Sequence, residues 1–174
     1  MIQFKEGDWR GWLAALAVSF VLVGLASAPP FLPGSIRPWI MEMFAGVCHQ
    51  IPSRSFHIDG VPLAVCHRCI GIYLGFPIAG FLFLFLKGAW PFSSKTAPFV
   101  LMLSALPAGL DWGLDFIGWW SNTPTSRFAT GLVLGTVAGY FFTAALAEGF
   151  KQKPKPSSLS PVSKHVISAP KATQ

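Results

Sequence analysis

Long apolar runs dominate the chain and are separated by short polar stretches. Four of these runs are predicted to be helices, at about residues 9–28, 69–86, 97–120 and 126–150. Each approaches or exceeds the roughly 20 residues that a helix needs to cross the hydrocarbon core of a bilayer. Tryptophans lie near the ends of the runs, as aromatic side chains do at membrane interfaces. The pattern predicts an all-α integral membrane protein with about four transmembrane helices, forming one domain over residues 1–150.

The segments between and after these runs differ in character. Residues 29–68 begin with closely spaced prolines, which prevent one continuous helix. Pro38 is placed to open a short interfacial or re-entrant helix that ends near Cys48. Residues 151–174 are rich in Lys, Pro and Ser, and are expected to form a disordered basic tail in the cytoplasm.

Composition supports a membrane environment. The 174 residues are 52% apolar and only 11% charged, whereas a soluble domain has about 25% charged residues. The net charge of +6 comes from basic residues in the last quarter of the chain and beside apolar runs. Because no basic face with interleaved aromatics is evident, we expect a lipid bilayer and no nucleic acid as a partner.

The distribution of Lys and Arg predicts the topology. With four spans, the side that holds both termini carries nine basic residues, and the other side carries four. The positive-inside rule then predicts a multi-pass protein of the cell (inner) membrane with both termini in the cytoplasm and residues 29–68 outside. A signal peptide ending at Ala28 is the alternative for the first run, although Pro29 disfavours cleavage. Both interpretations place the cysteine-containing loop outside.

Three cysteines, all in or next to that loop, carry the most distinctive chemistry. Cys66 and Cys69 have the short spacing of zinc ligands, and Cys48 with His49 or His57 would complete a tetrahedral set. The second interpretation is thiol–disulfide chemistry at the same residues. The third is one disulfide that staples the loop beside a bystander cysteine. Zinc at Cys48, His49, Cys66 and Cys69 is the preferred hypothesis.

Two aspartates occur inside the third apolar run. Asp111 and Asp115 are four residues apart, so they share one helix face towards the outer end of the run. A charge within a span costs about 2.5–3.5 kcal/mol, and a metal, Arg127 or protonation would offset it. We therefore expect Asp111, Asp115 and Arg127 to be catalytic residues, with a structural ion pair to Arg127 as the alternative. Arg54 and Arg68 are candidates for anion binding, or else for ordinary interfacial snorkelling.

Small residues recur at helical spacing in the fourth run. Gly131, Gly135 and Gly139 form a small-xxx-small series, which is typical of helix packing surfaces in membranes. The series predicts close helix contact, either within the chain or in an oligomer.

The motifs Cys48-His49-Gln50, Arg54-Ser55-Phe56 and Cys66-x-Arg68-Cys69-x-Gly71-Ile72-Tyr73-x-Gly75 resemble an uncharacterised family of bacterial and archaeal membrane proteins, the domain of unknown function 2085. Asp111 and the run from Ser121 to Gly135 are similar to the second half of that family. The resemblance covers roughly residues 44–140. It implies a small multi-span protein, and it implies no reaction.

Three functions remain open at this level. The first is a metal-dependent membrane enzyme acting on a lipid or small molecule at the outer leaflet, with an aspartate as general base. The second is a thiol–disulfide or quinone-linked redox protein. The third is a non-enzymatic structural subunit or metal-handling protein, in which the glycine series binds partner helices.

Overall fold

The computed structural model describes residues 8–86 and 96–150, so the predicted disordered tail lies outside the described residues. Four long helices have the length and hydropathy to cross a membrane, which confirms the prediction of a helical membrane protein. The helices are α1 (Asp8–Ser27), α2 (Arg37–Ala45), α3 (His67–Leu86), α4 (Ala97–Phe116) and α5 (Pro124–Gly149), the 3-10 turns are η1 (Pro29–Phe31) and η2 (Pro52–Arg54), and the strands are β1 (Ser55–Ile58) and β2 (Val61–Cys66).

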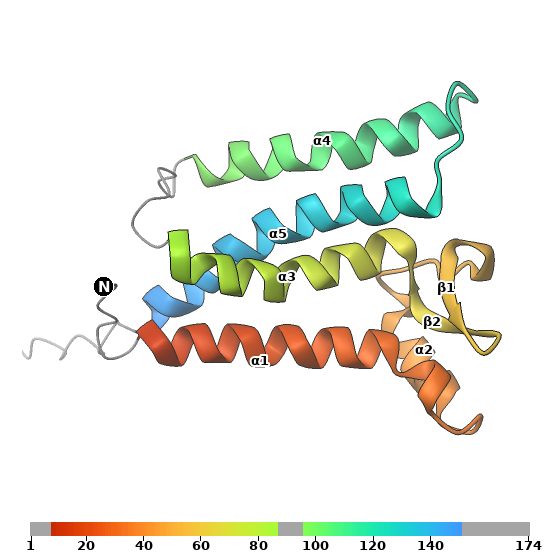
Figure 1. The fold of residues 1–174 in the computed structure, drawn as a ribbon, viewed down its shortest axis with the longest axis horizontal. Helices are drawn as coiled ribbons and strands as arrows, with labels where there is room; N and C mark the ends of the chain where they lie inside the picture. The colour runs from red at the N-terminus through yellow and green to blue at the C-terminus, as the bar shows by residue number, and fades with distance from the viewer. Residues whose placement is uncertain (1–7, 87–95, 151–174) are drawn as a thin grey trace, which may run out of the picture.

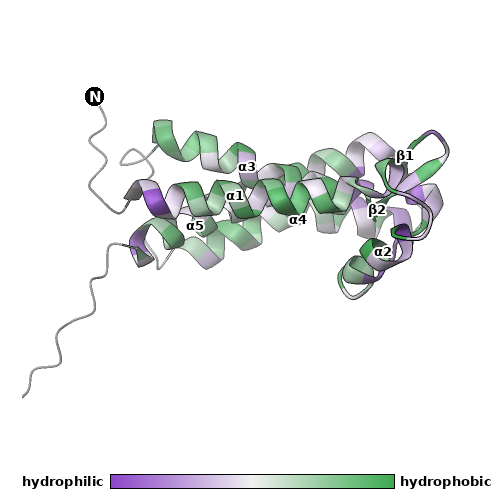
Figure 2. Ribbon diagram, turned by 90° about the horizontal axis from the view of Figure 1, so that it is seen from below, coloured by the Kyte–Doolittle hydropathy of each residue, from purple (hydrophilic) through white to green (hydrophobic). Residues whose placement is uncertain are grey.

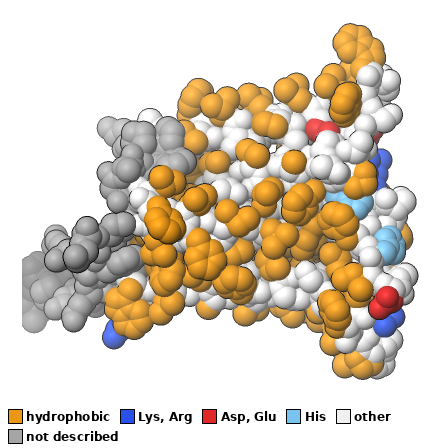
Figure 3. All heavy atoms as spheres, in the orientation of Figure 1, with side chains coloured by type: hydrophobic (Ala, Val, Ile, Leu, Met, Phe, Trp, Pro, Cys, Tyr) orange, Lys and Arg blue, Asp and Glu red, His pale blue; other side chains and the backbone are white. Residues whose placement is uncertain are grey.

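The four long helices run side by side, and the remaining elements gather at one end (Figure 1). The start of α1 and the end of α5 lie at the opposite end from β1, β2 and α2 (Figure 1). Apolar residues cover the long helices, whereas polar residues concentrate around the strands and α2 (Figure 2). In the space-filling view, hydrophobic side chains likewise cover the flank of the bundle (Figure 3). The cysteine-containing segment therefore forms a cap on one end of an apolar bundle.

Backbone contact between α3 and α5 forms the centre of the bundle. A Cβ atom at Gly135 would collide with the backbone of Ile72, and one at Gly75 would collide with the backbone of Gly135. Gly131 and Gly139 approach α3 in the same way. The glycine series predicted from the sequence is thus covered by a helix of the same chain. That face is not free to bind a partner helix, so of the two alternatives these glycines support packing within the chain and not an oligomer.

Helix α4 is the least enclosed of the four. Its extensive helix contacts are with α5, and many of its large apolar side chains are exposed. The helix ends at Phe116, and Gly118 adopts a left-handed conformation, with φ 75°, in the turn that follows. Residues 117–120, which were expected within the third span, therefore belong to the connection to α5.

A β-hairpin that the sequence analysis did not predict leads into α3. Strands β1 and β2 are antiparallel, with Ser55 opposite Cys66 and Ile58 opposite Val61. Asp59 and Gly60 make the turn with φ values of 49° and 77°. An Asp-Gly pair between short apolar runs is a strong hairpin signal, because both central residues of the turn need positive φ. Strand β2 contributes Leu63, Ala64 and Val65 to a small core that also contains Ala26, Phe44, Cys48 and Ile70.

Candidate metal centre

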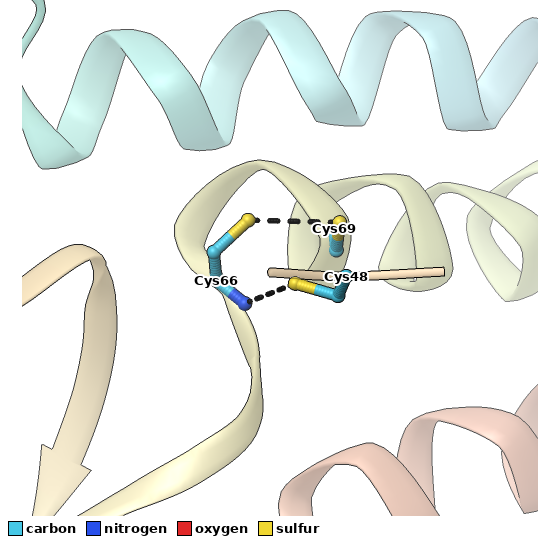
Figure 4. Close-up of side chains that lie close together, drawn as sticks. All are labelled: Cys48, Cys66 and Cys69. Atoms are coloured by element: carbon cyan, nitrogen blue, oxygen red, sulfur yellow. Dashed lines mark hydrogen bonds between the residues drawn. The ribbon is translucent and has the colours of Figure 1, made fainter. Parts of the chain in front are cut away.

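Three thiols converge at the capped end of the bundle. The sulfur atoms of Cys48, Cys66 and Cys69 all lie within 4.8 Å of one another. The Sγ atoms of Cys66 and Cys69 are 3.6 Å apart, and the backbone N–H of Cys66 donates to the Sγ of Cys48 at 3.3 Å (Figure 4). Cys48 is buried and the other two are partly buried. All three thiols are free.

Three different elements hold these cysteines in place. Cys48 follows α2, and its N–H donates to the carbonyl of Phe44 at 2.9 Å. Cys66 is the last residue of β2, and Cys69 lies in the first turn of α3. The change from strand to helix between Cys66 and His67 brings the sulfurs of Cys66 and Cys69 together, and the backbone N–H of Cys66 faces the sulfur of Cys48 (Figure 4).

The spacing of the sulfurs is compatible with a shared metal ion, and no two of the three are bonded to each other. A disulfide requires a bond of about 2.05 Å between two sulfurs. In a tetrahedral zinc site with Zn–S bonds of about 2.3 Å, two ligating sulfurs lie about 3.8 Å apart. The 3.6 Å between Cys66 and Cys69 is close to the second value. The donor set of three soft thiols also suits zinc.

The local electrostatics favour a thiolate at Cys66. Hydrogen bonds with the thiols of Cys48 and Cys69 hold the pKa of the Cys66 thiol well below its usual range. Backbone N–H groups of Cys69 and Arg68, at the start of α3, act in the same direction, while burial opposes them. The thiolate is the form that ligates metals, so this environment favours the ligating form at Cys66.

Gln50 fixes the segment that carries Cys48. Its backbone has φ 50°, which is uncommon for a residue other than glycine. Its side-chain amide donates to the carbonyl of Met41 at 2.5 Å and to the carbonyl of Ala64 at 2.9 Å. Gln50 thereby ties the chain after α2 to both α2 and β2. These two bonds anchor the side chain and so hold the backbone of Gln50 in its uncommon conformation.

The Arg54-Ser55-Phe56 motif supports Cys66 from the opposite strand. Ser55 is buried, and its hydroxyl donates to the carbonyl of Ile51 at 3.2 Å. The ring of Phe56 packs edge-on against His67, with 4.3 Å between the ring centroids, and also contacts Phe128 of α5. This motif therefore anchors the hairpin to the bundle beside the thiols.

A pocket of about 340 Å³ opens beside the sulfur cluster. Its polar wall includes Cys48, Cys66, Cys69, His49, Arg54 and Arg68. His49 is exposed, and its ring nitrogens do not join the group of three sulfurs. The predicted fourth ligand therefore lies in the same pocket but is not part of the cluster.

Asp111 has a different partner from the one expected. Within the described part of the chain, Arg68 rather than Arg127 makes its ion pair, with 2.6 Å between Arg68 Nη2 and Asp111 Oδ2. The hydroxyl of Ser126 donates to Asp111 Oδ1 at 2.7 Å. Asp111 is buried, and Arg68 is partly buried. The pair ties α4 to the first turn of α3, so the alternative interpretation of a structural ion pair applies with Arg68 as the cation.

Asp115 contributes to the turn between α4 and α5. The backbone N–H of Asn122 donates to Asp115 Oδ1 at 3.2 Å, and the side-chain amide of Asn122 donates to the carbonyl of Asp111 at 3.4 Å. Neither Asp111 nor Asp115 is among the described residues that line the pocket. Asp111 reaches the pocket only through Arg68.

Comparison with known proteins identifies the family. The family model described as "Predicted membrane protein (DUF2085)" matches residues 48–141, which is more than half of the chain. The chain belongs to this family. It is 30% identical to an uncharacterised protein of Methanocaldococcus jannaschii over 114 residues, or 66% of this chain and 72% of the relative. It is 35% identical to an uncharacterised protein of Methanothermobacter thermautotrophicus over 92 residues, which are 53% of this chain and 80% of that relative. No solved structure matches the chain.

The family match bears out the resemblance seen in the sequence. The DUF2085 region begins at Cys48 and contains all three cysteines, Arg68 and Asp111. All of α1 and α2 precede it, although both pack against the core beside the cysteines. The supporting roles of Gln50, Ser126 and Asn122 were not predicted. Gln50 lies in a quoted motif, and Ser126 could have been found as the N3 residue of the capping box that begins α5 at Thr123.

Proposed function

We propose that this membrane protein binds a zinc ion through the thiolates of Cys48, Cys66 and Cys69. The observation that carries the proposal is the convergence of three free thiols within 4.8 Å, on elements that fix their positions independently. Zinc bound by three protein ligands keeps a fourth position for water or substrate, which is typical of catalytic rather than structural sites. Held in this way, the ion would supply Lewis-acid chemistry next to the pocket.

The pocket residues have distinct proposed roles. Arg54 and Arg68 offer guanidinium groups to an anionic part of a ligand. Asp111 acts as a positioning residue, because its carboxylate holds Arg68 against the pocket wall. His49 offers its imidazole nitrogens as hydrogen-bonding groups to a bound ligand. We propose an enzyme that acts on a lipid or small molecule held in this pocket.

The orientation in the membrane is part of the proposal. The cysteine end is opposite to the start of α1 and the end of α5 (Figure 1). The excess of Lys and Arg on the side of the termini favours a cytoplasmic location for them. We therefore propose that the cysteine cap faces outwards, at the outer leaflet.

Metal analysis of the purified protein tests this function. Wild-type protein purified without chelator should contain about one zinc per chain, and Cys66→Ser should contain much less. Val18→Ala, at an exposed position in the middle of α1, serves as the control and should keep its zinc. A folded wild-type protein that holds no zinc, and takes none up on dialysis, would contradict the proposal. Copper in place of zinc would change the identity of the metal but keep the site.

Thiol redox chemistry is the second candidate, and the proximity of Cys66 to Cys69 favours it. In that case the two residues should cycle between dithiol and disulfide, with Cys48 as the third thiol. Thiol trapping in cells under oxidising and reducing growth conditions distinguishes the two functions. A pair that stays reduced and protected from alkylation until a chelator is added supports zinc, whereas a pair that changes state with growth conditions supports redox chemistry.

A further inference from the structure

The wall of the pocket changes from polar to apolar as it approaches the bilayer-spanning helices. Ile72 of α3 and Trp112 of α4 line it together with the cysteines and arginines. Ile72 is five residues after the start of α3, which places it about 7–8 Å along the helix at 1.5 Å per residue. The pocket thus extends from the cap to Ile72 of α3 and Trp112 of α4, two helices that have the length and hydropathy to cross a membrane.

The helix that forms the apolar side of this opening is exposed. Trp112 is 55% exposed and stacks on Phe116 of the same helix, with 5.6 Å between the ring centroids. Helix α4 packs along α5 and is joined to α3 at this end by the Arg68–Asp111 pair. Trp112 is therefore both exposed on the surface of α4 and part of the pocket wall.

The position of α2 places the pocket mouth at the membrane interface. Trp39 and Met43 are four residues apart on one side of α2, Ile36 just before the helix and Val47 just after it continue the same spacing, and all four are exposed. The opposite side of α2 packs into the core through Phe44. An exposed apolar face on a short helix at the end of a membrane bundle is accommodated by lying in the headgroup region. Val47 itself lines the pocket.

The polar end of the pocket is suited to a phosphate group. Arg54 and Arg68 line it, and no Asp or Glu does so among the described residues. The Nη2 of Arg68 is bonded to Asp111, and its Nε is buried. The exposed guanidinium of Arg54 is therefore the one placed to donate directly to the oxygens of a phosphate, while Arg68 adds positive charge. The ligand would therefore present its anionic group to the arginines and its alkyl chain to Ile72 and Trp112.

From these observations we infer that the pocket binds a membrane lipid with a phosphate headgroup, which enters laterally between α3 and α4. This inference rests on the proposed function in that the headgroup would lie beside the proposed metal centre, and it identifies the substrate class of that site. A soluble phosphate compound would use the arginines alone, whereas a phosphate-bearing lipid would use both walls of the pocket.

Native mass spectrometry of the detergent-solubilised full chain tests the inference with three probes. They are dioleoyl phosphatidic acid, dioleoylglycerol with the same chains but no phosphate, and glycerol phosphate with the phosphate but no chains. Wild-type protein should bind phosphatidic acid at least about tenfold more tightly than either fragment, since both a charge-assisted contact and apolar contacts are then made. Equal binding of dioleoylglycerol, or equal binding of glycerol phosphate, would overturn the inference.

Two exposed arginines provide a matched pair of variants. Arg54→Gln should weaken phosphatidic acid binding about tenfold, because one charge-assisted contact is lost. Arg10→Gln, in α1 at the far end of the bundle, should leave it unchanged. An equal effect of the two variants would indicate nonspecific attraction and overturn the inference. Zinc measured on the same samples separates the proposals: zinc without lipid selectivity defeats this inference alone, and lipid selectivity without zinc defeats the metal centre alone.

Discussion

Gly131→Ala is predicted to disturb both the bundle and the cysteine cluster. A Cβ atom at this position would lie 3.0 Å from the carbonyl carbon of Arg68 and 3.2 Å from its Cα, and would overlap the carbonyl oxygen. Carbon atoms in unstrained contact lie about 3.5–4.0 Å apart, so α3 and α5 must separate locally. Added atoms at a closely packed contact cost about 1–3 kcal/mol. The affected backbone belongs to Arg68, between Cys66 and Cys69, so zinc retention should fall as well.

The assay is unfolding in mixed micelles by titration with sodium dodecyl sulfate, followed by circular dichroism, with zinc measured on the folded samples. Gly109→Ala makes the same chemical change in α4, where a Cβ atom would meet nothing within 4 Å. This control should be as stable as the wild type or slightly more so, because alanine favours a helix over glycine. If Gly131→Ala and Gly109→Ala unfold at the same point and keep the same zinc, the proposed coupling between helix packing and the cluster is wrong.

Other variants separate the parts of the site. Asp111→Asn should lower the free energy of unfolding by about 3 kcal/mol. This is the lower end of the range for breaking a buried ion pair, because Arg68 is partly exposed. An unchanged unfolding midpoint would contradict the assigned pairing. Gln50→Ala should leave the helical content unchanged but speed zinc loss to a chelator, since the segment carrying Cys48 loses two hydrogen bonds; loss at the wild-type rate would show that Gln50 does not fix Cys48. His49→Ala should retain its zinc, and loss of zinc would make His49 the fourth ligand.

The sequence was most informative where composition alone decides the structure. The four apolar runs became four long helices, since a chain with so few charges can satisfy its backbone in a bilayer only by forming them. The sequence also predicted that Cys48 would lie near Cys66 and Cys69, because all three belong to one short segment. The family was recognisable from the same residues.

Partners that depend on helix rotation and on loop geometry were not predictable. Asp111 faces Arg68 rather than Arg127 because of how α4 turns on α5, which the apolar pattern does not specify. The hairpin was missed because its strands are short, although its Asp59-Gly60 turn was visible. The glycine series correctly predicted close helix contact, but only the packed structure shows that α3 covers Gly131 and Gly135.

X-ray absorption at the zinc edge of the purified, zinc-loaded protein tests the central claim most directly. The account predicts three sulfur neighbours at about 2.3 Å and one oxygen or nitrogen neighbour at about 2.0–2.2 Å, with the light atom retained in His49→Ala. Four sulfur neighbours would show that a second chain completes the site, and a zinc environment without sulfur would show that Cys48, Cys66 and Cys69 do not bind the metal. Either result would contradict an open three-thiolate centre.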